Sequence, residues 1–270
     1  MQALKDELGD KVTFDVQNAS GEVNNCTNIT NKFVSEDVDL IMANATPALQ
    51  AAVNSTLDIP VLGTSVTEYG VALQIKDFNG TVGGNVSGTS DLAPLDQQAA
   101  MLQEWFPDAK NVGLLYCSAE ANSEYQVEVV KKELEALGYT CKDYSFSDFN
   151  DVQAVSTKAA AESDVIYIPT DNTAASSAEI IRAACIDGDK KVPIIAGEEG
   201  VCKGCGVATL SISYYDLGYT TGKMAAKILT GEADISTMPV QYAETFTKKY
   251  NKEICDELGL TPPEGYEAIA

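Results

Sequence analysis

Five short polar runs in this chain hold the residue types that could bind or react with a small molecule. Two lie early, at residues 44–46 (Asn-Ala-Thr) and 64–67 (Thr-Ser-Val-Thr), and three lie later, at 121–123, 169–173 and 197–200. Each comes after an apolar run that is typical of a buried β-strand. Ligands of open parallel sheets bind outside the carboxyl ends of the strands. We therefore expect these runs to line one ligand site.

The early and late runs differ in charge. The early runs offer neutral hydroxyl and amide donors at expected helix starts, which suit a carboxylate. The late runs add Asp171 and Glu199, which suit an ammonium group. A zwitterion would satisfy both, although the same residue types are also common helix caps and turn formers. The candidate ligand-binding residues are Thr46, Ser65, Thr67, Ser90, Asp91, Asn122, Ser123, Asp171, Asn172 and Glu199.

Several classes of chemistry are excluded by what the sequence lacks. The chain has no histidine, which removes histidine triads, general bases and metal ligands together. No Gly-x-Gly-x-x-Gly follows a strand, and the phosphate-loop motif is absent, so we expect no nucleotide cofactor. Glu198 and Glu199 are neighbours whose side chains would point to opposite faces of an extended segment. They therefore cannot form the facing acid pair of a glycosidase.

Cys202-Lys-Gly-Cys205 has C-x-x-C spacing, and the chain holds seven cysteines in all. A structural zinc site needs four ligands, and neither a second such pair nor a histidine completes one. We expect no metal site, and the two thiols are either ordinary buried residues or a redox pair. An enzyme would need Cys202 or Cys117 as a nucleophile activated without histidine.

Length and charge limit the partners. The 270 residues exceed one ordinary hydrophobic core and predict two domains. Lys and Arg total 18 against 40 Asp and Glu, a net charge of -22 that repels phosphate backbones, so we expect no nucleic-acid binding. No apolar run approaches the roughly 20 residues of a membrane helix. Residues 1–5 do not resemble a signal peptide, so we expect a cytoplasmic protein or an export segment outside this sequence.

Apolar strands alternate with amphipathic helices, which is typical of parallel α/β architecture. Strands are expected at residues 12–17, 39–43, 59–62, 86–89, 111–117, 139–144, 164–168, 192–196 and 206–213. Helices are expected at 23–34, from about Pro47, at 95–105, from Asn122 or Ser123 to 137, and at 152–161, 173–186 and 217–229. The strands at 39–43 and 164–168 both deliver Thr and Asn into a loop before a helix, which indicates two lobes built on one plan.

Three motifs carry a resemblance to a known family. They are residues 86–91 (Val-Ser-Gly-Thr-Ser-Asp), 167–173 (Tyr-Ile-Pro-Thr-Asp-Asn-Thr) and 213–222, which begins Ser-Tyr-Tyr-Asp-Leu-Gly-Tyr. Almost the whole chain resembles ABC transporter substrate-binding proteins of the type 1 periplasmic-binding-protein group that includes tryptophan- and phenylalanine-binding members. The resemblance implies two Rossmann-like three-layer lobes joined by a hinge of three crossings. Lobe one would be 1–89 plus 214–236, and lobe two 90–213 plus 237–270.

The resemblance also implies roles for the candidate residues. Hydroxyls of Thr46, Ser65 and Thr67 match loops that hold the ligand carboxylate, and Glu199 matches the ammonium partner. Asp171 and Asn172 sit at the neighbouring strand end. The implied function is an extracytoplasmic receptor, periplasmic or a cell-surface lipoprotein. It would bind an amino acid, with an aromatic one favoured, and pass it to the permease of an ABC importer. A sensing module for a membrane receptor or kinase is the alternative on the same fold.

One departure from the family concerns the first lobe. Family members begin with a strand and a loop before the helix that starts here at about Met1. That strand lies in the middle of the lobe-one sheet. We therefore predict that residues 12–17 either pair directly with 39–43 or that another segment fills the gap.

Overall fold

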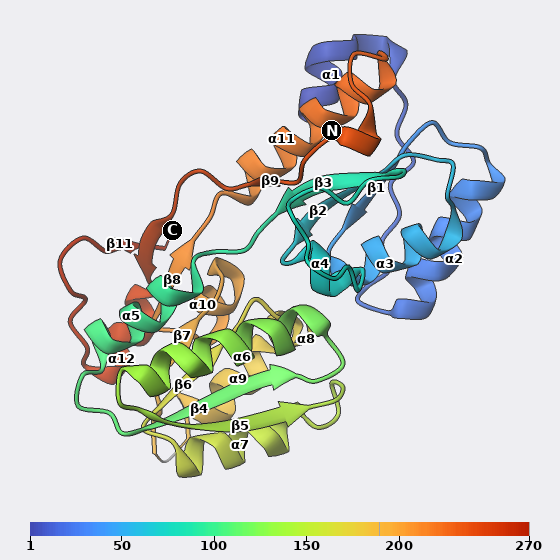
Figure 1. Cartoon of the computed structure of the whole chain (residues 1–270). Helices are drawn as coiled ribbons and strands as arrows, with labels where there is room; N and C mark the ends of the chain where they lie inside the picture. The colour runs from blue at the N-terminus through green and yellow to red at the C-terminus, as the bar shows by residue number, and fades with distance from the viewer. Residues whose placement is uncertain (189, 270) are drawn as a thin grey trace. The chain divides into compact units, whose positions relative to one another are not determined.

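The computed structural model describes residues 1–188 and 190–269, and the chain divides into two compact units. Unit 1 is Met1–Leu92 with Ser213–Glu244, and unit 2 is Ala93–Ile212 with Thr245–Ala270. The chain passes between them after Leu92, after Ile212 and after Glu244 (Figure 1). The first two crossings lie close to the predicted ones at 89 and 213. The predicted end of lobe one at 236 is too early, because a later strand pairs with the unit 1 sheet.

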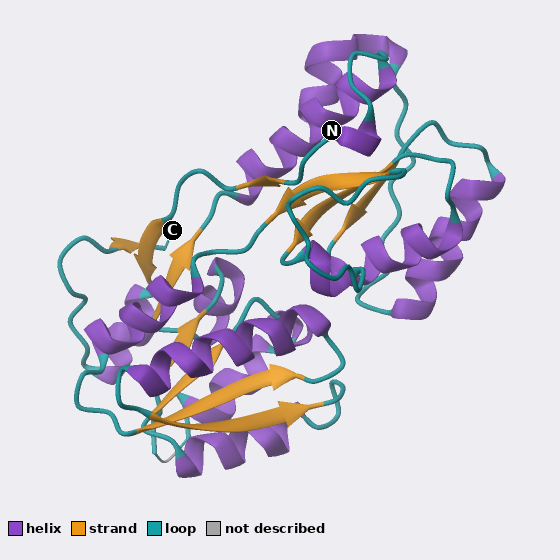
Figure 2. Ribbon diagram, in the orientation of Figure 1, coloured by secondary structure: helices purple, strands orange, loops and turns teal. Residues whose placement is uncertain are grey.

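Unit 1 is a parallel sheet covered by helices on both faces (Figure 2). The strand order is β1 (Ile41–Asn44), β2 (Val61–Val66), β3 (Val86–Ser90) and β9 (Gln241–Tyr242). The covering elements are α1 (Gln2–Leu8), η1 (Gly9–Lys11), α2 (Val23–Ser35), α3 (Thr46–Ser55), α4 (Tyr69–Ala72), α11 (Tyr214–Leu229) and η2 (Ile235–Thr237). β9 joins the sheet by pairing Thr89 with Gln241 and Ser90 with Tyr242.

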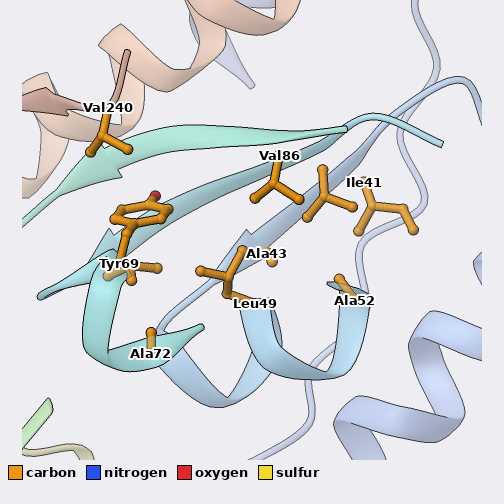
Figure 3. Close-up of a cluster of buried hydrophobic side chains, with 10 residues drawn as sticks. Ile41, Ala43, Leu49, Ala52, Tyr69, Ala72, Val86 and Val240 are labelled. Carbon is orange, nitrogen blue, oxygen red and sulfur yellow. The ribbon is translucent and has the colours of Figure 1, made fainter. Parts of the chain in front are cut away.

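The two faces of this sheet bury different sets of side chains, because successive residues of a strand point to opposite sides. Ile41 and Ala43 of β1 pack with Leu49 of α3 and Val86 of β3 (Figure 3). Met42, between them, packs on the opposite face in a cluster of residues from α1, β2 and α11. A strand that is covered on both sides must be apolar where it is covered, which explains the uninterrupted apolar run at 40–43.

The predicted strand at residues 12–17 is wrong. Within the described residues, β1 pairs only with β2, and neither residues 12–17 nor any other segment lies in the sheet beyond β1. Val12 and Phe14 instead pack on the cluster that α1 and α11 form. Asp15 makes an ion pair of 2.7 Å with Lys32 of α2. Without a neighbouring strand, the alternation of residues 12–17 buries two side chains but cannot form strand hydrogen bonds.

Unit 2 has a seven-stranded sheet in the order β11-β10-β8-β7-β6-β4-β5, and only the β10–β8 pair is antiparallel. Its strands are β4 (Asn111–Cys117), β5 (Thr140–Phe146), β6 (Val165–Ile168), β7 (Ile194–Ala196), β8 (Ala208–Ser211), β10 (Thr247–Tyr250) and β11 (Glu267–Ala268). Its helices are α5 (Leu95–Trp105), α6 (Ala121–Ala136), α7 (Val152–Glu162), α8 (Asn172–Ser176), α9 (Ala178–Cys185), α10 (Glu199–Cys205) and α12 (Lys252–Leu258).

The strand order of unit 2 reverses between β4 and β6. From β4 the chain moves outward to β5 through α6, and then returns through α7 to β6, β7 and β8. Right-handed crossovers in opposite directions place their helices on opposite faces of a sheet. Accordingly α5 contacts α6, whereas α7 and α10 contact α9. The loops after β4 and β6 therefore diverge, which makes this edge the expected ligand-binding crevice of the unit.

Most predicted elements are confirmed, and two helices differ in an informative way. The helix predicted at 173–186 is divided into α8 and α9 at Ser177. The next helix along the sheet edge, α6, starts at Ala121 with Glu120 as its N-cap, so neither Asn122 nor Ser123 is the cap that we predicted. Both residues lie inside the first turn and are buried.

The contact between β2 and β3 requires glycine. A Cβ atom on Gly88 would lie 2.1 Å from the carbonyl oxygen of Gly63 and 2.2 Å from the hydroxyl of Tyr69. Gly88 also has a φ of 150°, which L-residues rarely adopt. The space is taken by Tyr69, whose hydroxyl donates to the carbonyl oxygen of Thr89 at 3.1 Å.

We predict that Gly88→Ala lowers the free energy of unfolding by about 3 kcal/mol or more, because overpacking and backbone strain add. Gly218→Ala in α11 is the matched control, since a Cβ there meets no atom within 4 Å. That change should be neutral or stabilise by about 0.5–1 kcal/mol, because alanine favours a helix. Urea unfolding of both variants measures the difference, and equal stabilities would contradict the steric argument.

Candidate functional site

In unit 1 the candidate hydroxyls lie where β1 and β2 end. Thr46 is the first residue of α3, after Ala45, which has a φ of 77°. Ser65 has a φ of 54° and lies in an irregularity where the β2–β3 register shifts between Gly63 and Val66. This bulge leaves Ser65 half-buried, whereas Thr46 and Thr67 are almost fully buried. The three hydroxyl residues therefore share one edge of the unit 1 sheet.

Ser90 and Asp91 belong to unit 1 rather than to lobe two, where the sequence placed them. The Ser90 hydroxyl donates to the Thr67 carbonyl at 2.7 Å and accepts from the Leu92 N–H at 3.1 Å. The Asp91 carboxylate accepts from the hydroxyl of Tyr214 at 3.1 Å. Ser90 thus ties the loop after β2 to the end of β3, and Asp91 ties the end of β3 to the first residue of α11.

In unit 2 two buried carboxylates close the loop after β6. Glu120 accepts four hydrogen bonds of 2.7–3.0 Å, from the backbone and side chains of Asn172 and Thr173. Asp171 accepts from the Ala174 N–H and from the Cys117 N–H, both at 2.7 Å. The Cys117 bond joins the end of β4 to the end of β6 across the point where the strand order reverses. Both acids therefore tie the end of β4 and the loop after it to the start of α8.

Asn122 and Gln126 of α6 extend this network. The side-chain amides of both donate to the Thr170 carbonyl at 3.0 Å, and the Gln126 carbonyl oxygen accepts from the Thr170 N–H at 3.1 Å. The Asn122 amide also lies 3.3 Å from the Ser123 hydroxyl. Asn122 Oδ1 is buried without a hydrogen-bond partner among the described residues. Since buried acceptors are normally satisfied, this oxygen is a candidate to receive a ligand donor.

Burial perturbs the acids at this edge. Loss of solvation, together with the nearby charge of Glu120, raises the pKa of Asp171 to about 6 in spite of the two backbone N–H bonds that lower it. A raised carboxyl pKa stabilises the fold at low pH. That contribution is fully present below 3.8 and is lost as the pH rises through about 6.

Glu198 and Glu199 differ in role although they are adjacent. Glu198 caps α10 by accepting from the N–H groups of Gly200 and Val201, and burial raises its pKa. Glu199 Oε2 accepts from the Ser211 hydroxyl at 2.5 Å and from Lys249 Nζ at 2.7 Å. Burial alone would raise the Glu199 pKa, but these two bonds outweigh it and the pKa is lowered. Glu199 is therefore an ionised, half-exposed carboxylate.

The structure brings Asn122, Ser123, Asp171 and Asn172 into one network and links it to the next loop through Thr170, whose hydroxyl donates to the Gly197 carbonyl at 3.4 Å. Sequence reasoning missed four contributors: Glu120, Gln126, Ser211 and Lys249. None of the four lies in a motif that the sequence marks.

The cysteine thiols are the remaining reactive side chains. Burial raises the pKa of the Cys202 and Cys117 thiols, and the chain has no histidine to activate them. The seven cysteines are free thiols, and Cys202 and Cys205 are fully buried in α10. Over residues 1–188 and 190–269, no cluster of three or more potential ligands could hold a metal ion. Nor does any helix in that part of the chain have the length and apolarity to cross a membrane.

We predict that Glu120→Gln lowers the pKa of Asp171 from about 6 toward 3.8, because a like charge is removed. Carbon-13 NMR of labelled aspartate measures it, with the resonance assigned through Asp171→Asn. Glu124→Gln, on the exposed side of α6, is the control and should leave the titration in place. An unchanged Asp171 titration in Glu120→Gln would contradict the coupling.

Comparisons with known proteins agree with this architecture. The chain is 36% identical over 243 residues to the tyrosine-binding protein of Clostridioides difficile, covering 89% of this chain and 69% of that protein. The structure of an ABC domain in complex with L-Trp from Streptococcus pneumonia superposes with a TM-score of 0.91 at 31% identity, covering 100% of this chain and 94% of that one.

A ligand-free, open substrate-binding protein with adhesive properties from Clostridium difficile superposes with a TM-score of 0.73 at 34% identity, covering 99% of this chain and 91% of that one. These solved structures support the type 1 periplasmic-binding-protein fold that the motifs predict. The family model for ABC transporter substrate-binding proteins matches residues 1–270, and the chain belongs to that family.

Proposed function

We propose that this protein is the extracytoplasmic receptor of an ABC importer and that it captures an aromatic amino acid between its two units. The observation that carries the proposal is the division of charge between the two sheet edges. Unit 1 offers the neutral hydroxyls of Thr46, Ser65 and Thr67, and its candidate acid Asp91 is engaged by the hydroxyl of Tyr214. Unit 2 offers Glu199 as an ionised carboxylate. The tyrosine-binding and L-Trp-bound relatives favour an aromatic side chain.

The ligand carboxylate is assigned to unit 1. Thr46, Ser65 and Thr67 supply hydroxyl donors at one sheet edge. The first turn of α3, a helix of 10 residues, adds backbone N–H groups that have no acceptor within the helix. Such groups favour an anion. Ser90 supports this edge by holding the Thr67 carbonyl rather than by touching the ligand.

The ligand ammonium is assigned to unit 2. Glu199 would accept one charge-assisted hydrogen bond from the ammonium group of the ligand. Asn122 Oδ1 of α6 offers a second, neutral acceptor. Asp171 and Glu120 use their oxygens within the loop after β6, so their role is to hold that loop.

We propose capture without turnover. A ligand that contacts both units favours the closed arrangement by its differential affinity for that state. The three crossings between the units are the hinge. Delivery to a permease, and export of the chain to the cell surface or periplasm, follow from the family and are part of the proposal.

We predict that tyrosine, tryptophan or phenylalanine raises the melting temperature in a thermal scan against the twenty amino acids. A ligand at 100 times its Kd stabilises the folded state by about 2.7 kcal/mol. Histidine and lysine serve as controls with the same zwitterion and a different side chain. No shift with any amino acid would refute the proposed ligand class.

We predict that Glu199→Gln weakens binding of the preferred amino acid by about 10–100-fold, because a charge-assisted hydrogen bond is lost. Thr46→Ala should cost only about 2–10-fold, since a neutral hydroxyl bond is weaker. Isothermal titration calorimetry measures both, with Glu135→Gln on the exposed side of α6 as the control. If Glu199→Gln bound with the same affinity as the wild type, the assignment of the ligand ammonium to Glu199 would be wrong.

A further inference from the structure

We infer that Lys249 and Ser211 are positioning residues for the ligand ammonium, because they hold one oxygen of Glu199 and leave the other for the ligand. This inference rests on the proposed function, which assigns the ammonium to Glu199. It adds two residues that the motifs of the chain do not mark.

Both contacts converge on the same atom. The Ser211 hydroxyl donates to Glu199 Oε2 at 2.5 Å, and Lys249 Nζ donates to that oxygen at 2.7 Å. Oε1 receives neither bond. A carboxylate that is fixed through one oxygen keeps its second oxygen in a defined place, so the ligand does not have to order it.

The register between two strands brings the two donors together. β10 runs antiparallel to β8, with Lys249 opposite Thr209 and Thr247 opposite Ser211. Residues two apart along a strand share a face, so Lys249 and Ser211 lie diagonally on one side of the sheet. Glu199 enters from α10, the helix between β7 and β8. Lys248, one residue earlier, points the other way and pairs with Glu104 at 2.7 Å.

The groups around Glu199 explain why Lys249 is needed to keep this carboxylate ionised. Lys249 and Lys203 favour the ionised form, whereas burial opposes it. The carboxyl of Glu198 and the protonated, buried thiol of Cys202 also lie near enough to interact with Glu199. With Lys249 removed, the Ser211 bond and the charge of Lys203 would still oppose burial, but the pKa of Glu199 would be higher than in the wild type. A proton would then compete with the ligand ammonium at a higher pH than in the wild type.

Titration calorimetry with tyrosine from about pH 4.5 to 8 tests the inference on Lys249→Met and Ser211→Ala. We expect wild-type affinity to stay level down to about pH 5. Lys249→Met should lose affinity as the pH falls, with its midpoint at least about one pH unit higher, and should bind about tenfold more weakly at pH 5 than at pH 8. Ser211→Ala should shift in the same direction by less. Lys249→Arg should restore the wild-type profile.

Lys248→Met is the matched control, and its profile should follow the wild type. The desamino analogue 3-(4-hydroxyphenyl)propanoate has no ammonium group, so Lys249→Met should not change the pH midpoint of its binding.

A Lys249→Met profile parallel to the wild type, or an equal loss of affinity at every pH, overturns the inference while leaving the proposed function intact. No binding of any aromatic amino acid by the wild type overturns both.

Discussion

Two buried carboxylates, Glu120 and Asp171, hold the edge of the unit 2 sheet on which the proposed ligand site depends. Burying a carboxylate is costly unless its oxygens are hydrogen-bonded. Here the donors are backbone and side-chain groups of the loops after β4 and β6. The hydrogen bonds that offset the cost of burying the two carboxylates therefore also fix the loops where the strand order reverses. The side-chain amides of Asn122 and Gln126 then bind α6 to the loop after β6, because both donate to the Thr170 carbonyl.

In the loop after β7, the same need for hydrogen-bond donors gives the adjacent acids Glu198 and Glu199 different roles. Both oxygens of Glu198 accept hydrogen bonds from N–H groups at the start of α10. Asp171 caps the start of α8 in the same way. Glu199, by contrast, keeps about a third of its side chain exposed and meets a cation on one oxygen. An acid that caps a helix is not free for a ligand, whereas an acid that is ionised and only partly engaged is. The donors available to each acid thus separate Glu198, which holds the helix start, from Glu199, to which we assign the ligand ammonium.

The sequence predicted the fold well where the signal is local. Apolar runs and helix periodicity placed α2, α5 and β4 within a residue or so of their observed bounds. It failed where an outcome depends on a distant partner. Residues 12–17 alternate like a strand but have no neighbour in the sheet, and Lys249 differs from Lys248 only through the β8–β10 register. Glu199 stands in a polar run that the sequence singled out, but Ser211 and Lys249, which lie 12 and 50 residues away along the chain and donate to it, could not be predicted.

The strong acidity of the chain sharpens the role of a single lysine. With 40 acids against 18 basic residues, the general field favours cations and disfavours ionised carboxyl groups. A binding carboxylate in such a protein is at risk of protonation, and burial adds to that risk. A local cation counters both effects but repels an incoming ammonium if it occupies the same place. Because Lys249 donates to Oε2, the group that keeps Glu199 ionised does not fill the position that we propose for the ligand ammonium.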